Sequence, residues 1–253
     1  MANHPRSMPH ARVRPQAFPV RGAYPGRARA LPRAPRPRQA FLDHIDAAPF
    51  PCVGAKAARA RDAIEIHEFP DLGRAGSDQR LWSRLRRFGA AMDAADPADT
   101  TVRSLAAVFS DPGPTSELRF ERMVWEQLQR LHRVDREAGE GWAEDVSSDP
   151  GDPDFSFSIG GHPFFIIGLH PAASRRARRC PVPVLVFNSH RQFEQLKADG
   201  RYAKMQAATR QRDRRLQGSI NPNLADFGTA SEARQYSGRH VEAAWRCPFR
   251  KGE

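Results

Sequence analysis

In the first half of the chain, apolar residues recur at helical spacing in two segments, which predicts two amphipathic helices. The first helix is predicted over residues 78–93, with Ser77 at its amino end as a cap. The second is predicted to start after Ser116 and to end before Gly139. A shorter helix is predicted over residues 102–109, where an Asp-Pro-Gly-Pro run stops it.

The pattern changes after a turn-rich connector at residues 147–154. Residues 155–161 alternate apolar with small polar side chains, as a half-buried strand does, and residues 163–171 follow across a Gly-Gly-His link. This arrangement predicts a β-hairpin. Residues 181–189 are rich in valine and predict a third strand, and their two prolines predict that it starts at a sheet edge.

Three more helices are predicted beyond the strands, starting at the cap Ser189, over residues 201–216 and over residues 231–245. The expected fold is therefore α+β, with a small antiparallel sheet of about three or more strands wrapped by helices. We expect residues 41–253 to form a single domain.

Composition adds to this picture mainly through the location of charge. The chain has 253 residues, of which 40% are hydrophobic, enough for one sizeable core. Nine of the net +11 charges are arginines within residues 1–40, a Pro-rich segment without Lys, Asp or Glu. Such a segment cannot bury a core, so a disordered tail is predicted there. The nearly balanced remainder argues against nucleic acid as the main partner, although the tail leaves that alternative open.

The sequence lacks the features of membrane-spanning, disulfide-rich and zinc-binding proteins. The chain has no apolar run of the length that a membrane-spanning helix needs, so no membrane partner is expected. Three scattered cysteines, Cys52, Cys180 and Cys247, predict neither a disulfide framework nor a structural zinc site. A reduced, cytoplasmic setting is the expectation.

His170 and the arginines after it are the first candidates for chemistry. His170 follows a predicted strand and precedes a proline, which favours an extended backbone there. A neutral imidazole so placed is a good iron ligand, and the alternative is a histidine hydrogen-bonded at a strand end. The cluster Arg175, Arg176, Arg178 and Arg179 suits carboxylate or phosphate groups, or else forms a solvated face.

A second group of candidates is a dense set of polar residues between positions 188 and 240, interrupted by Gly and Pro. Polar side chains beside turns can orient a small polar ligand, and an exposed surface with helix caps is the competing interpretation. The set comprises Asn188, Gln192, Arg212, Asp213, Gln217, Asn221, Glu232, Arg234, Gln235, Tyr236 and Arg239.

Several of these motifs together resemble a known family. The chain is similar to the YqcI/YcgG family in FPCVGAKAA (50–58), in DPDFSFSIGGHPFFIIGLHPAASRRARR (152–179) and in three further stretches at 183–205, 210–228 and 231–249. The better-understood members of the family resemble the haem-dependent N-oxygenases of guanitoxin, D-cycloserine and nitroimidazole biosynthesis. The resemblance implies haem b, activation of dioxygen, and transfer of oxygen to nitrogen of a small amine or arginine-like guanidine. It also implies electrons from an external reductase or ferredoxin. A haem-binding sensor or carrier is the alternative, and a homodimer is left open.

The resemblance also implies roles for residues. His170 would be the proximal iron ligand, with the Cys52 thiolate as its rival and Cys247 as a weaker third choice. The other expected roles are cofactor binding by Arg175, Arg178, Arg179, Arg234 and Arg239, charge pairing with substrate by Glu232 or Asp213, and hydrogen bonding by Asn221, Gln235 and Tyr236.

Overall fold

A computed structural model describes Met1 and residues 36–110, 113–223 and 229–252. Within these residues the strands form one five-stranded sheet in the order β1-β2-β5-β4-β3. The sheet with its surrounding helices confirms the predicted α+β class. The strands are β1 (Ile64–Phe69), β2 (Ser104–Phe109), β3 (Phe157–Ile159), β4 (His162–Leu169) and β5 (Val184–Ser189).

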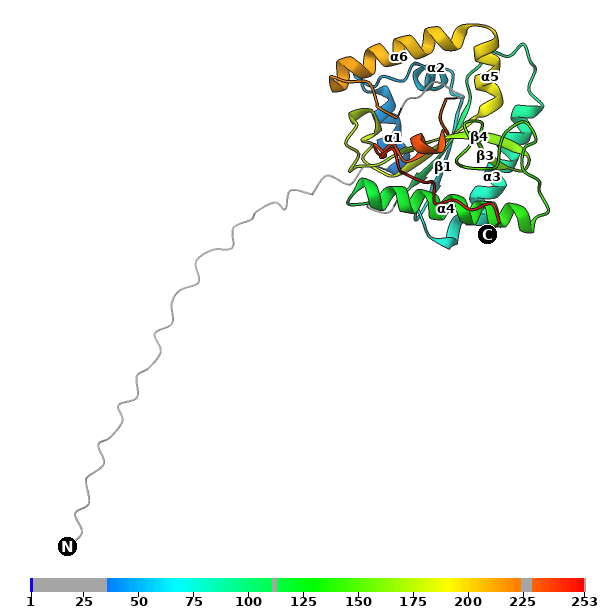
Figure 1. Ribbon diagram of the computed structural model, residues 1–253. Helices are drawn as coiled ribbons and strands as arrows, with labels where there is room; N and C mark the ends of the chain where they lie inside the picture. The colour runs from blue at the N-terminus through cyan, green and yellow to red at the C-terminus, as the bar shows by residue number, and fades with distance from the viewer. Residues whose placement is uncertain (2–35, 111–112, 224–228, 253) are drawn as a thin grey trace, which may run out of the picture. The chain divides into compact units, whose positions relative to one another are not determined.

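The helices pack on both faces of this sheet (Figure 1). Helices α3, α4 and α7 bury one face in a large aromatic core, and α1 and α2 pack on the opposite face, where α6 lies against α2. The helices are α1 (Pro37–Asp46), α2 (Val53–Ala60), α3 (Asp78–Asp93), α4 (Glu117–Glu137), α5 (His190–Ala198), α6 (Arg201–Gln217) and α7 (Ala233–Tyr236).

Several helix and strand predictions are confirmed. Helix α3 covers the predicted residues 78–93, and α4 follows Ser116, whose side chain accepts a hydrogen bond from Arg119 N. Ser189 caps α5 in the same way through Gln192 N. The predicted hairpin is the antiparallel pair β3 and β4, joined at Gly160 and Gly161, both of which adopt a positive φ.

The helix predicted over residues 102–109 is wrong, because this segment forms strand β2. Every residue of β2 is buried, since the strand lies between β1 and β5 and carries helices on both faces. A strand of this kind is apolar throughout and shows no alternation. Strand β1 was not predicted from the sequence. It runs parallel to β2, so the sheet is mixed and not purely antiparallel.

Two further predictions are corrected. Strand β5 does not start at an edge but lies in the centre of the sheet, because Pro181 and Pro183 precede the strand and leave its ladder intact. The helix predicted over residues 231–245 is only the single turn of α7. Gly238, with φ of 81°, adopts a left-handed conformation that ends it.

Strand β1 forms one border of the sheet, and two arginines bind its outer carbonyl groups. Arg38 Nη1 donates to Ile66 O at 3.2 Å, and Arg80 Nη2 donates to Glu68 O at 2.6 Å. Arg38 belongs to α1, which begins at Pro37, inside the segment predicted to be a tail. The disorder predicted for residues 2–35 falls outside the described residues.

Candidate functional site

The two faces of the sheet differ in how completely they are covered. On the α3 and α4 side, the neighbouring residues Leu105, Phe187 and Ile166 are fully buried. On the other side one cross-sheet row consists of Ile66, Ala106, Val186 and Ile167, and only Ala106 is fully buried. We call this row the open row. An apolar row that crosses a sheet and is only partly buried offers a surface for an apolar ligand.

Helices α5 and α6 flank this side of the sheet with half-buried aromatic side chains. Phe193 on α5 makes an edge-to-face contact with Phe165 of β4 at 6.0 Å between ring centroids, and with Tyr202 of α6 at 6.1 Å. Helix α6 also approaches α2 closely, because a Cβ placed on Gly54 would lie 3.2 Å from Met205 Cε. These contacts form an apolar wall that borders the open row.

Cys52 lies on the same side of the sheet, at the amino end of α2. Its half-buried side chain packs against the apolar cluster that contains Phe41 and Ile45, as the side chains of Val186 and Ile167 also do, and its Sγ accepts a hydrogen bond from Ala55 N at 3.4 Å. Burial raises the pKa of the Cys52 thiol, and the N–H groups at the helix start and the Arg178 guanidinium oppose that rise. A bound metal cation would deprotonate such a thiol.

Arg178 is a buried cation whose hydrogen bonds go to neutral groups. Its guanidinium donates to Gly168 O at 3.0 Å and to Gln235 O at 3.3 Å, and no carboxylate among the described residues pairs with it. Burial lowers the pKa of Arg178 to about 10. A buried guanidinium without an acidic partner favours binding of an anionic group nearby.

Arg175, by contrast, already has its counter-ion. It donates to Asp213 at 2.5 Å and to Ser219 Oγ at 2.9 Å, in a buried pair that also receives the backbone N–H of Asn221 at 3.3 Å. Asn221 therefore lies beside the Arg175 pair and not beside Glu232, with which it was grouped in the sequence-based prediction.

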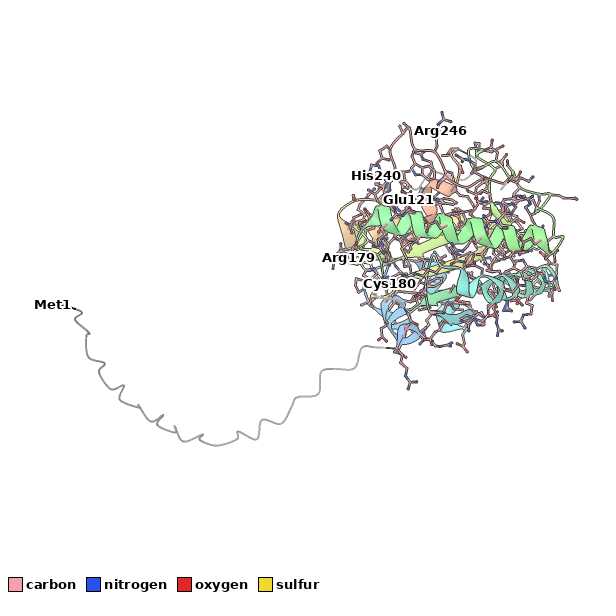
Figure 2. The ribbon with its side chains drawn as sticks, turned by 90° about the horizontal axis from the view of Figure 1, so that it is seen from below. Met1, Glu121, Arg179, Cys180, His240 and Arg246 are labelled. Carbon is pink, nitrogen blue, oxygen red and sulfur yellow. The ribbon has the colours of Figure 1, made fainter. Side chains whose placement is uncertain are left out.

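The remaining predicted arginines are held by local contacts. Arg179, labelled in Figure 2, donates to Ala173 O at 2.8 Å. Arg234 donates to Glu242 O and lies over the ring of Trp245. Arg239 pairs with Glu121 of α4 and with Glu242. These contacts account for all three side chains within the protein itself.

His170 is enclosed and does not face an open space. Its ring stacks on Phe120 of α4 at 4.1 Å, its residue is 1% exposed, and neither ring nitrogen has a hydrogen-bond partner or measurable exposure among the described residues. Burial lowers the pKa of His170 to about 4. Both ring nitrogens are therefore enclosed by the described residues, and neither faces an open space in this arrangement.

Glu232 and Tyr236 do lie together, but inside the aromatic core. Tyr236 Oη donates to Glu232 Oε1 at 2.5 Å and accepts from Phe157 N, and Ser156 Oγ donates to the same carboxylate oxygen at 2.9 Å. Burial and the neighbouring Glu232 raise the pKa of Tyr236 well above its usual value. These contacts join α7 to strand β3 and leave the carboxylate no direct path to a substrate.

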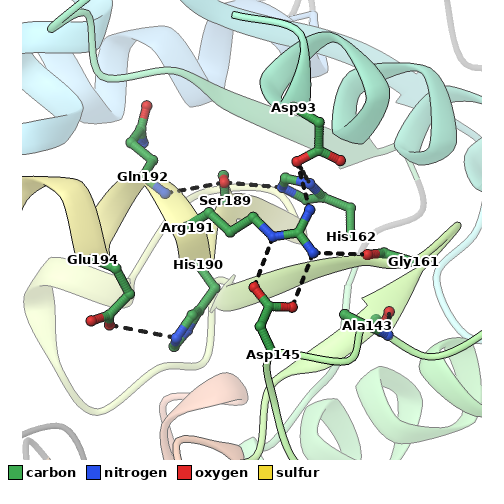
Figure 3. Close-up of polar contacts among 11 residues, drawn as sticks. Asp93, Ala143, Asp145, Gly161, His162, Ser189, His190, Arg191, Gln192 and Glu194 are labelled. Atoms are coloured by element: carbon green, nitrogen blue, oxygen red, sulfur yellow. Dashed lines mark hydrogen bonds and ion pairs between the residues drawn. The ribbon is translucent and has the colours of Figure 1, made fainter. Parts of the chain in front are cut away.

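A further polar cluster was missed by sequence reasoning (Figure 3). His162 Nδ1 lies 2.8 Å from Asp93 Oδ1, and its Nε2 lies 3.0 Å from Ser189 Oγ. Arg191 bonds to Asp93, to Asp145 and to Gly161 O. Asp93, His162 and Ser189 are connected in the order of a catalytic triad. However, Ser189 is buried and its hydroxyl already caps α5, so that hydroxyl cannot reach a substrate. The cluster fastens the hairpin to α3 and α5.

Comparison with known proteins decides the family. The model of the YqcI/YcgG family matches residues 41–250, which is most of the chain. The protein belongs to the YqcI/YcgG family. This YqcI/YcgG chain is 27% identical over 215 residues to "Uncharacterized protein YcgG" of Bacillus subtilis strain 168, a match that covers 81% of this chain and 82% of the relative. It is 25% identical over 217 residues to "Uncharacterized protein YqcI" of the same organism, with coverage of 80% and 81%. No solved structure matches.

The YqcI/YcgG match contains all the site residues described above, including Cys52, Arg178 and the open row. Within the residues that the structure covers, no three His, Cys, Asp or Glu side chains gather as a metal-binding group. None of the described helices has the length and apolar character to cross a bilayer.

Proposed function

We propose that the protein binds haem over the open row and uses dioxygen and external electrons to N-oxygenate a small amine or guanidine substrate. The observation that carries this proposal is a partly buried apolar row and a thiol, Cys52, that pack against the same apolar cluster, together with a buried guanidinium, Arg178, that has no acidic partner among the described residues. The motif resemblance to the haem-dependent N-oxygenases supports the same chemistry.

The residues on this side of the sheet suit the parts of a haem group. Cys52 would hold the iron as a thiolate, and Arg178 would pair with a propionate. Val186, Ile167 and Met205 would contact the apolar faces and edges of the macrocycle. The haem, when bound, supplies activation of dioxygen, and thiolate ligation favours cleavage of the O–O bond.

The protein would contribute orientation and exclusion of water. Asn188 lies at the same sheet face in register with Phe165, and its side chain is fixed because Ser104 Oγ donates to Oδ1 at 2.7 Å and Nδ2 donates to Phe165 O at 3.3 Å. A fixed amide of this kind can orient a polar substrate nitrogen. The Phe193 and Tyr202 rings would shield the reacting nitrogen from water.

The experiment is haem reconstitution followed by absorption spectroscopy of the ferrous carbonyl complex. The wild-type protein is expected to show a Soret band at the longer wavelength that thiolate ligation produces, and Cys52→Ser is expected to lose or shift that band. Cys180→Ser is the matched control, because Cys180 is a buried thiol of the same apolar cluster. A wild-type protein that stays colourless, or a Cys52→Ser spectrum identical to wild type, would overturn the proposal.

Product analysis then tests the chemistry. Reconstituted protein with a surrogate reductant and a panel of amines that includes arginine is expected to yield an N-hydroxylated product by mass spectrometry. Haem binding without any product across the panel would favour the sensor or carrier alternative.

A further inference from the structure

A second site candidate lies at the β1 border of the sheet, next to the Ile66 end of the open row. A hollow of about 260 Å³ is formed there by β1, α1 and α3, and its polar lining is Arg38, His67, Glu68, Arg80 and Arg84. We call this hollow the β1 cleft. From the charges that face it, we propose that the β1 cleft binds a small phosphate-bearing molecule through its three arginines.

The charge of the cleft is predominantly positive. Three guanidinium groups face one carboxylate, that of Glu68, which accepts the backbone N–H of Arg38 at 2.8 Å. The remaining polar group, His67, is paired with Glu65 outside the lining at 2.5 Å. Among the residues that the structure describes, no other acidic side chain lines the hollow. The excess of cationic groups therefore favours an anion.

The arginines retain donors for such a ligand. Arg38 and Arg80 each give one nitrogen to a carbonyl of β1, and Arg80 also lies over the Phe69 ring, with Cζ 4.5 Å from the centroid. These contacts fix both side chains and leave most of their N–H groups unused. Arg84, which is half-buried on α3, makes no hydrogen bond or ion pair with any described residue.

The residue type and the size of the hollow select the ligand class. Planar guanidinium groups bind phosphate oxygens through paired hydrogen bonds, which ammonium groups cannot match. The volume lies below the range usual for drug-sized ligands, so it suits inorganic phosphate or a small phosphate monoester.

The test is isothermal titration of the full chain with inorganic phosphate and with glycerol phosphate at low ionic strength, with sodium chloride at matched ionic strength as the reference. Phosphate is expected to bind wild-type protein at a single site, and Arg84→Gln is expected to weaken it at least about tenfold, the loss of one charge-assisted contact. Arg87→Gln is the matched control, because Arg87 lies one turn away on α3, is exposed and does not line the hollow. Tighter binding of glycerol phosphate than of inorganic phosphate would identify a monoester site.

Three outcomes would overturn the proposal: no saturable phosphate binding, an equal effect of Arg84→Gln and Arg87→Gln, or an equal effect of chloride. Arg38→Gln provides a second variant on a different helix if Arg84→Gln lowers stability. None of these readouts depends on haem, so the result is separate from the fate of the proposed oxygenase function.

Discussion

Asp93 Oδ1 lies 2.8 Å from Nδ1 of His162, and this contact joins the end of α3 to the β3–β4 hairpin (Figure 3). His162 is almost fully buried, and burial lowers its pKa while Asp93 raises it. The replacement Asp93→Asn removes the carboxylate charge that counteracts the effect of burial on His162. It is expected to lower the free energy of unfolding by about 1–2 kcal/mol, as measured by urea denaturation.

Asp145→Asn is the control for this prediction. Asp145 bonds to the same Arg191 but not to His162, and its side chain is about half exposed, so a loss of less than about 1 kcal/mol is expected. Equal losses for the two variants would mean that the histidine contact contributes nothing of its own.

Gly168 on β4 lies where no side chain fits. A Cβ there would lie 2.6 Å from Phe120 Cε1 and 2.8 Å from Tyr236 O, and the second contact is with backbone. Gly168→Ala is therefore expected to cost on the order of 2–3 kcal/mol in thermal or chemical denaturation. Gly141→Ala, which meets nothing within 4 Å, is expected to change stability by no more than roughly 0.5 kcal/mol.

His170 makes the protein sensitive to acid. Burial lowers its pKa from 6.5 to about 4, so the imidazole is neutral in the folded state at a pH where the unfolded chain binds a proton. The unfolded state then binds more protons, and stability falls as the pH drops from 6.5 towards 4, by about 3 kcal/mol in total from this group.

His170→Phe is expected to remove this part of the acid sensitivity. A phenyl ring can keep the stacking on Phe120 without two unpaired nitrogens, so stability at neutral pH should be equal or higher. Denaturation curves across this pH window give the comparison, and parallel losses in both proteins would assign the acid sensitivity to other groups.

The open row predicts an asymmetry between the faces of β5. Val186→Phe adds volume where the sheet is only partly covered and is expected to cost less than about 1 kcal/mol, and under the proposed function it would also lower haem binding. Leu185→Phe adds volume to the fully packed opposite face and is expected to cost about 1–3 kcal/mol. Similar costs in chemical denaturation would show that the two faces are equally packed.

Local signals in the sequence were enough for much of the fold. Helix α3 was predictable because Leu81, Leu85 and Phe88 repeat at helical spacing, and the hairpin was predictable from its alternation and its glycines. Strand β2 was not predictable in this way, because burial on both faces removes the polar positions that distinguish strand from helix.

The candidate site was only partly predictable for a similar reason. Cys52 and Arg178 stand out as residue types, but the open row joins residues from four strands that only the sheet register brings together. The distance of 69 positions between Asp93 and His162 likewise gives no local signal. The spacing of apolar residues along the chain does not show which part of a sheet the helices will cover. It also does not show which distant residues will come into contact.

Arg38 and Arg80 occupy the outward carbonyl groups of Ile66 and Glu68 on β1 with side chains of the same molecule. A β-segment from a neighbouring molecule would have to displace both guanidinium groups before it could hydrogen-bond to this border. These two contacts therefore raise the cost of fibril-like strand addition at this border.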